Sequence, residues 1–445
     1  MFSLAIRSVA QRPGRLIATL LSAFLGSVII MAFNSMHDTA AGRNIDGRSS
    51  DTLTIAASVV GGYGTLLVFF AIASTLTVNV RQRNEEIALL RRTGATPAQI
   101  KWMVVVESGV VAVVGMLLAI VPAMIGGEQL LKVFKETDQV AESVDYVFGP
   151  IALAAGVSIG LIASVGASFL AVRRATKAAA GGAEPRRRGR TVGGFAAFVL
   201  GVGGICSTFM FKKTDPALMA APAYGAILIS VGFAVFSPVL LKFLLGKLAR
   251  PVIAVTGASG YLTVHNMRQR ASQLSSVLMP LILFVGMASV TLYMQSIQND
   301  ALDASGITRS VDDKSIETLN FVVVGIIVVF SCIMLINTLY AATTYRTREF
   351  GQHRLAGATP GQVLGMVTIE SLVLTATGVF FGTAAALAGA VPFSLVRVDA
   401  VLPDQGPGIW LTIVGIGAVA TIVTSVATTY RALRTPAVEA VALAA

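Results

Sequence analysis

The amino-acid sequence predicts an all-α polytopic membrane protein with about ten transmembrane helices. We expect two pseudo-symmetric four-helix units plus two linking spans, joined by short extracellular loops. The composition is 55% hydrophobic and only 13% charged, far from soluble averages of about 45–50% apolar and about 25% charged residues. In addition, the stretch from Arg81 to Ser108 returns as Thr344 to Ser371 at a constant offset of 263 residues. Such a register indicates an internal duplication.

Each expected span is an apolar run of roughly 20 residues, the length that the hydrocarbon core of a bilayer requires. Met1 to Gly14 precedes the first run and is predicted to be an interfacial helix, with an unstructured basic flank as the alternative. The first run is long for a signal peptide, so we prefer an uncleaved span. The expected spans are residues 15–36, 53–78, 102–125, 151–172, 192–211, 221–245, 274–295, 320–340, 363–391 and 409–430.

The duplication divides the chain into three expected parts. Residues 1–178 form the first four-span unit, residues 179–256 hold a basic linker and two connecting spans, and residues 257–445 form the second four-span unit. The segment from Arg173 to Arg190 is strongly basic and is interrupted by Gly, Ala and Pro. It is therefore predicted to be a flexible linker on the anionic inner leaflet.

The loops between the spans carry a strong charge asymmetry. With the N-terminus inside, the cytoplasmic segments hold 25 of the 34 Lys and Arg residues, and the outside loops hold 16 of the 23 acidic residues. By the positive-inside rule, both termini and both copies of the repeated loop lie in the cytoplasm of a multi-pass protein. The acidic outer loops are interpreted as solvated surface.

Several kinds of chemistry are excluded by the motifs. The sequence has no GxxxxGK[ST] phosphate loop and no GxSxG nucleophile motif, so neither nucleotide hydrolysis nor serine catalysis is expected. Its histidines (His37, His265 and His353) and cysteines (Cys206 and Cys332) lie in separate segments, which provides no metal or disulfide site. The basic residues lie at span ends, which argues against nucleic-acid binding. We therefore predict no catalytic residue, no metal and no cofactor in this chain.

The repeated motif consists of a short charged helix, a Gly-Ala-Thr-Pro turn and a second helix that runs into an apolar span. In the first copy, Gly94 suits a left-handed helix cap, Thr96 suits an N-cap and Pro97 suits the first turn of the next helix. The sequence therefore predicts a compact helical hairpin that could fit a groove on a soluble partner. The alternative is a plain cytoplasmic loop that anchors two spans.

These residues resemble the FtsX-like permease family, the membrane subunits of mechanotransmission-type ABC transporters. The resemblance covers about Leu53 to Thr176 and Asn320 to Ala440. In that family a basic and acidic helix, followed by a turn of the form G-A-[ST], docks on the ATPase at the cytoplasmic side. The resemblance implies the following ATPase-coupling residues: Arg83, Glu86, Ile87, Leu90, Arg91, Gly94 and Ala95 in the first copy, and Arg346, Glu349, Arg354, Gly357 and Ala358 in the second.

The resemblance also implies a function. We expect a non-catalytic permease subunit in a bacterial plasma membrane, which exports or moves an amphiphilic substrate such as a peptide antibiotic or lipid and thereby serves antibiotic resistance. Its partners would be homodimeric or paired ABC ATPase subunits that bind ATP and Mg, membrane lipids, and possible extracytoplasmic proteins. Two alternatives stay open: a non-transporting transmembrane signal transmitter, and a secondary transporter. The scarcity of ionisable residues inside the spans argues against the second.

The two copies differ in their charged helix. The first copy has Ile87, Leu89 and Leu90 where the second has Phe350, Gln352 and His353. Gly351 also lowers the helix propensity of the second copy, by about 0.5–1 kcal/mol relative to Ala. We therefore expect the first copy to carry more of the ATPase contact.

Overall fold

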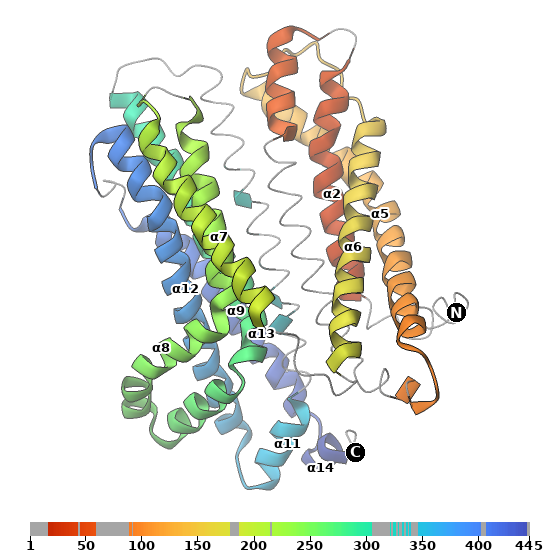
Figure 1. Ribbon diagram of the computed structural model, residues 1–445, viewed down its shortest axis with the longest axis vertical. Coiled ribbons are helices and arrows are strands. Elements are labelled where there is room, and N and C mark those ends of the chain that lie inside the picture. Colours follow the sequence, from red (N-terminus) through yellow and green to blue (C-terminus); the bar gives the residue numbers. More distant parts are fainter. Residues whose placement is uncertain are drawn as a thin grey trace. The chain divides into compact units, whose positions relative to one another are not determined.

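A computed structural model describes residues 17–42, 45–58, 89–90, 92–178, 187–213, 216–304, 346–401 and 406–442, with scattered positions between 321 and 339. Every regular element in these residues is a helix, which confirms the predicted all-α class. The main helices (Figure 1) are α2 (Ile17–Ala40), α5 (Pro97–Glu136), α6 (Pro150–Ala178), α7 (Arg187–Ser207), α8 (Ala220–Gln269), α9 (Ala271–Ala304), α11 (Thr347–Leu355), α12 (Pro360–Val398), α13 (Gly408–Leu433) and α14 (Ala437–Ala442).

Within the described residues, 7 helices are long and apolar enough to cross a membrane, and α6 contains a shorter apolar stretch, Pro150–Gly166. These stretches coincide with eight of the expected spans. The expected spans at 53–78 and 320–340 lie largely outside the described residues, as does the expected interfacial helix at Met1 to Gly14. The polytopic membrane character is thus confirmed.

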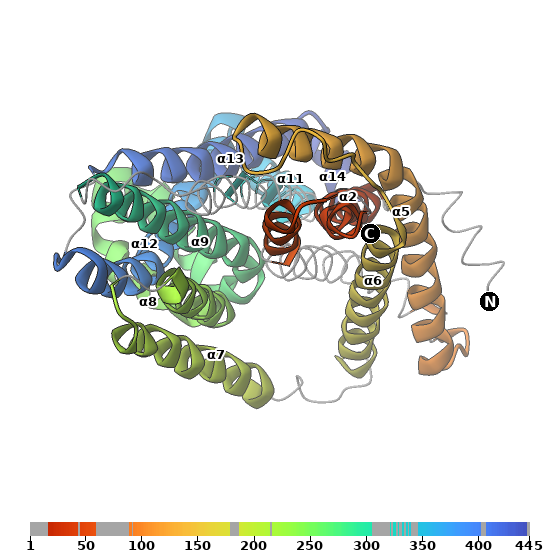
Figure 2. The same ribbon diagram turned by 90° about the horizontal axis from the view of Figure 1, so that it is seen from above.

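The chain forms two compact units. The first comprises Met1–Arg186 with Ile307–Ile326, and the second comprises Arg187–Gly306 with Ile327–Ala445. In the first unit α2, α5 and α6 pack against one another, as Figure 2 shows end on. In the second unit α9, α12 and α13 do the same, while α8 packs on α9 and α12 and α7 packs on α8. The sequence offset pairs α2 with α9, α5 with α12, and α6 with α13, so both copies build the same three-helix core.

A glycine at the same repeat position permits close helix packing in both units. A Cβ atom on Gly115 of α5 would lie 3.1 Å from the backbone nitrogen of Phe24 and 3.2 Å from the carbonyl oxygen of Leu20, both on α2. A Cβ atom on Gly378, the equivalent residue of α12, would collide with the side chain of Leu281 on α9. Small residues at such contacts let helix backbones approach closely, which is how membrane helices gain packing energy.

The two units differ at the end remote from the repeated turns. In the first unit the carboxylate of Asp38, on α2, accepts hydrogen bonds from the backbone nitrogens of Ile151 (3.0 Å) and Ala152 (2.8 Å). These N–H groups belong to the first turn of α6, where they have no partner within the helix and favour a negative charge. The equivalent position in the second copy is Ala301, so the duplication does not extend to this cap.

Candidate functional site

The two Gly-Ala-Thr-Pro turns have the same backbone conformation. Gly94 and Gly357 have φ values of +95° and +98°, a left-handed region that glycine enters without steric cost. Thr96 has φ −73° and ψ 152°, and Thr359 has φ −74° and ψ 153°. This agreement confirms the predicted helix cap and N-cap, and it shows that the duplicated sequence folds into duplicated turns.

Side-chain hydrogen bonds fix the start of the second helix in each hairpin. The backbone nitrogen of Gln99 donates to Thr96 Oγ1 at 3.3 Å, and the backbone nitrogen of Thr96 donates to Gln99 Oε1 at 2.9 Å. Thr359 and Gln362 repeat this capping box with the same two distances. A capping box satisfies two N–H groups that a helix N-terminus leaves open. Each turn is therefore held firmly at the end of a long membrane helix.

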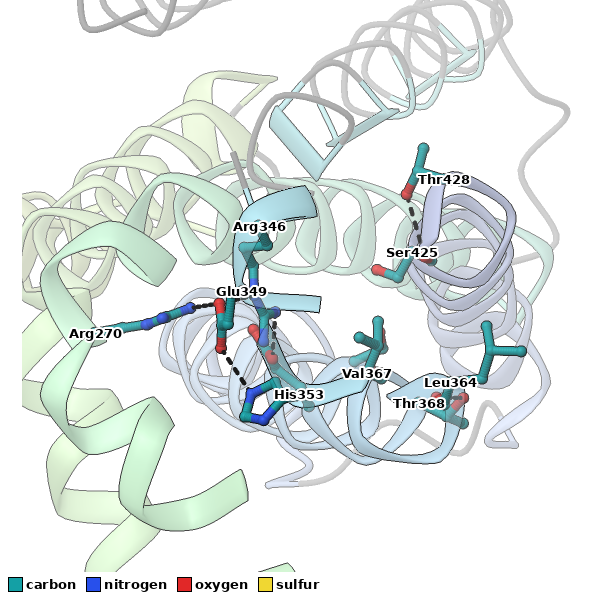
Figure 3. Close-up of polar contacts among 11 residues, drawn as sticks. Arg270, Arg346, Glu349, His353, Leu364, Val367, Thr368, Ser425 and Thr428 are labelled. Atoms are coloured by element: carbon teal, nitrogen blue, oxygen red, sulfur yellow. Dashed lines mark hydrogen bonds and ion pairs between the residues drawn. The ribbon is translucent and has the colours of Figure 1, made fainter. Parts of the chain in front are cut away.

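In the second unit a network of buried ion pairs connects the charged helix α11 to two other helices (Figure 3). Arg346 Nη1 lies 2.6 Å from Glu370 Oε2 on α12, and Arg346 Nε lies 3.2 Å from Glu349 Oε2. Arg270, between α8 and α9, places its Nη1 2.5 Å from the same Glu349 oxygen. His353 Nε2 lies 3.6 Å from Glu349 Oε1. We refer to Arg270, Arg346, Glu349 and Glu370 as the ion-pair network.

The ion-pair network is electrically balanced, with two guanidinium groups and two carboxylates. The side chains of Arg346, Glu349 and Glu370 are only 14%, 16% and 11% exposed. Burial alone would raise the pKa of Glu349, but the charges and hydrogen bonds of Arg346 and Arg270 hold that pKa below its ordinary value. Glu349 is thus ionised near neutral pH. Removing a single member would leave an uncompensated buried charge, which is strongly destabilising.

Other side chains of α11 also face the interior of the second unit. Phe350 is fully buried and lies in a cluster with Val363, Met366 and Leu433. Arg354 Nη1 donates to the carbonyl oxygens of Leu433 (3.1 Å) and Thr435 (2.8 Å) at the end of α13. The helix α11 is therefore attached to α12 and α13 by both apolar packing and hydrogen bonds.

The predicted coupling residues fall into three groups. Arg83, Glu86, Ile87 and Arg91 lie outside the described residues. Arg346, Glu349 and Arg354 come together inside the second unit and bind its own helices. At the turns, Gly94 and Gly357 are exposed, Ala95 and Ala358 are half-buried, and Leu90 is half-buried against Ile100 and Val104.

Sequence reasoning missed three residues of this site. Glu370 and Arg270 complete the ion-pair network, and Leu355 is 58% exposed beside the second turn. Leu89, which the sequence analysis did single out, is 59% exposed beside the first turn. One signal was available, because Glu370 has a repeat counterpart in Glu107. Both glutamates lie in otherwise apolar stretches, and both are buried. A carboxylate at the same buried position in both copies indicates a need for a nearby cation.

Gly351 has a packing role that helix propensity alone does not reveal. A Cβ atom there would lie 3.0 Å from both the carbonyl oxygen of Ala437 and the Cβ of Ala440 on α14. We expect Gly351→Leu to displace α14 and to lower the free energy of unfolding by about 1–3 kcal/mol, the usual cost of overpacking. Thermal unfolding in detergent measures this effect. Gly365→Leu is the matched control, because that exposed helical glycine has open space around it; equal effects would contradict the packing role.

A comparison with known protein families finds one match in each copy of the duplicated sequence. The model of the FtsX-like permease C-terminal domain matches residues 58–180 and 321–437, which together make up more than half of the chain. A comparison with curated proteins gives no significant match. Each family match includes one Gly-Ala-Thr-Pro turn with its capping box, and the second also includes three of the four residues of the ion-pair network. The chain therefore belongs to the FtsX-like permease family.

Proposed function

We propose that the chain is the permease subunit of an ABC transporter, which couples ATP hydrolysis by separate ATPase subunits to the movement or export of an amphiphilic substrate. The main supporting observation is the pair of Gly-Ala-Thr-Pro turns with matching caps, each at the start of a long apolar helix. A pair of ATPase subunits needs two docking elements related by approximate twofold symmetry, and a duplicated chain supplies both. The substrate class, a peptide antibiotic or lipid, comes from the family alone.

The proposed docking surface is the exposed tip of each hairpin. The first tip offers Leu89 beside Gly94, and the second offers Leu355 beside Gly357. These leucines do not occupy equivalent positions, since the repeat aligns Leu89 with Gln352. Apolar side chains that fill a partner pocket usually dominate an interface. In this proposal both copies have an apolar anchor, and the greater ATPase contact of the first copy stays a prediction.

The ion-pair network supplies the proposed route from the docking tip to the membrane helices. Arg346 and Glu349 lie at the start of α11, Glu370 lies on α12, and Arg270 lies immediately before α9. A push on α11 would therefore move α12 and α9 with it. Separating Arg346 from Glu370 would leave a buried carboxylate without its cation, and separating Arg270 from Glu349 would remove one of the two cations beside Glu349. In this proposal the nucleotide cycle changes the tilt of these spans.

The partner requirement is directly testable. We expect the detergent-purified chain to show no ATPase activity, because it has no phosphate-binding loop, and to form an active complex with a co-expressed ATPase subunit. ATP turnover by the isolated chain would contradict the proposal. The alternatives give other results: a secondary transporter moves its substrate without the ATPase, and a signal transmitter stimulates ATP hydrolysis without moving any substrate.

The proposal requires both hairpins to lie in the cytoplasm, as the basic residues indicate. In a background without Cys206 and Cys332, we expect a membrane-impermeant maleimide to label Ser143→Cys and Val401→Cys in intact cells, but not Thr93→Cys or Thr359→Cys. All four positions are exposed, so burial does not explain a lack of labelling. The reverse pattern would place the hairpins outside the cell and remove them from the ATPase.

A further inference from the structure

Helix α8 is bent into two arms at a glycine. Its 50 residues contain one non-helical position, Gly257, with φ 61° and ψ −135°. The first arm contains the candidate span Ala220–Pro251, and the second arm runs from the bend to Gln269. Arg268 Nη2 on the second arm donates to the carbonyl oxygen of Leu245 on the first arm at 3.3 Å. Figure 1 shows the bend at the end of the second unit where α11 also lies.

An open pocket of about 360 Å³ lies between the two arms. It is lined by Lys242, His265, Arg268 and Gln269, and Gln269 Nε2 lies 3.0 Å from His265 Nε2. The sequence contains no acidic residue between positions 216 and 299. In the described part of the chain, Lys242 and Arg268 take part in no ion pair. The pocket therefore presents two positive charges that an anionic ligand could neutralise.

The surroundings of the pocket are apolar and exposed. Val239 and Phe243 lie next to Lys242 on the first arm and are 64% and 58% exposed. On the second arm, the exposed ring of Tyr261 stacks on His265 with a centroid distance of 6.3 Å. Lys242 itself lies within the candidate span, near its end. This combination places a cationic site at the edge of the hydrocarbon region, and it favours a ligand with an anionic head and an apolar tail.

We propose that this pocket binds the phosphate of an anionic phospholipid in the membrane leaflet on the α11 side. Lys242 and Arg268 would neutralise the phosphate, and His265 or Gln269 would donate a hydrogen bond, since charge-assisted bonds to phosphate are strong. The acyl chains would lie along Val239 and Phe243. A free anion would gain nothing from these apolar side chains.

A lipid bound in this pocket would also affect the ion-pair network, because the pocket lies close in sequence to Arg270. Arg270 follows Arg268 by two residues and binds Glu349 of α11. A lipid that holds the second arm of α8 against the first arm would also steady the segment that carries Arg270. Lipid binding itself depends only on the pocket, so it can be tested without an ATPase partner.

Native mass spectrometry of the full chain in detergent tests the proposal. With equal amounts of phosphatidylglycerol and phosphatidylcholine, we expect at least about a fivefold preference for phosphatidylglycerol, which corresponds to the attraction of one or more cations. Lys242→Ala/Arg268→Ala should abolish this preference. The control Lys247→Ala/Arg250→Ala removes the same charge from exposed positions of α8 that do not line the pocket, and it should retain the preference.

Several results would overturn the assignment. Equal binding of the two lipids would exclude a site that recognises the anionic headgroup. An equal loss of the phosphatidylglycerol preference in both double variants would show a general attraction between the lipid and any positive charge on α8. Displacement of phosphatidylglycerol by an excess of inorganic phosphate would show a site for free anions instead of lipid. Because Arg268 also joins the two arms, the single variant Lys242→Ala is decisive if the double variant fails to fold. Full phosphatidylglycerol preference in folded Lys242→Ala would contradict the proposal.

Discussion

Arg346→Ala is expected to destabilise the second unit by about 3–5 kcal/mol, the cost of breaking a buried ion pair by removing one partner. Arg346 contacts Glu370 at 2.6 Å and Glu349 at 3.2 Å, and both carboxylates would stay buried with less compensation. The thermal unfolding midpoint of the chain should fall. In complex with its ATPase, the variant should also transmit the effect of nucleotide less well, because the ion pair between Arg346 and Glu370 would no longer join the start of α11 to α12.

A double-mutant cycle separates this contact from a general loss of structure. Arg346→Ala, Glu370→Ala and the double variant should be non-additive, with an interaction energy of about 0.5–3 kcal/mol. Gln352→Ala serves as a control on the same helix, because that glutamine is exposed and lies outside the ion-pair network. Additive effects of the Arg346 and Glu370 changes would show that the pair contributes nothing of its own.

Leu355→Asp, and separately Leu89→Asp, should each weaken capture of the ATPase at least about tenfold, or ~1.4 kcal/mol. Both leucines are exposed beside the repeated turns, so a new charge there costs little in the free chain. In an apolar pocket of the partner the same carboxylate would be buried without a cation, which is unfavourable. Co-purification of the ATPase with each variant at graded concentrations measures the effect.

Two further variants show whether a loss of ATPase capture is specific to the tips beside the repeated turns. Val401→Asp introduces the same charge at an exposed apolar residue near the opposite end of α12, and it should leave ATPase capture unchanged. Leu90→Asp should instead lower thermal stability, because Leu90 packs against Ile100 and Val104 within the chain. Undiminished capture by both Leu89→Asp and Leu355→Asp would exclude the tips as the docking surface.

The sequence predicted the parts of this site that local chain chemistry determines. Gly94 and Gly357 take left-handed conformations because no side chain opposes them, and Thr96 and Thr359 cap the next helix through a glutamine only three residues away. Eight of the expected spans were also identifiable, because runs of apolar residues need no tertiary information. The remaining two expected spans lie largely outside the described residues.

The sequence could not predict contacts between distant residues. Arg270 binds Glu349 across 79 residues, and Arg346 binds Glu370 across 24, so neither pair follows from helical spacing. The same applies to Gly351, which local propensity identifies only as a weak helix former. The packing role of Gly351 depends on its contact with α14, a helix that lies much later in the sequence. Exposure of Leu355 likewise depends on which face of α11 the ion-pair network turns inward.

Photo-crosslinking tests the docking claim most directly. A benzoylphenylalanine at position 355, in the full chain co-expressed with its ATPase subunit, should form a covalent adduct with that subunit, and the same residue at position 401 should form none. An adduct from position 401 without one from position 355 would contradict the proposed docking surface.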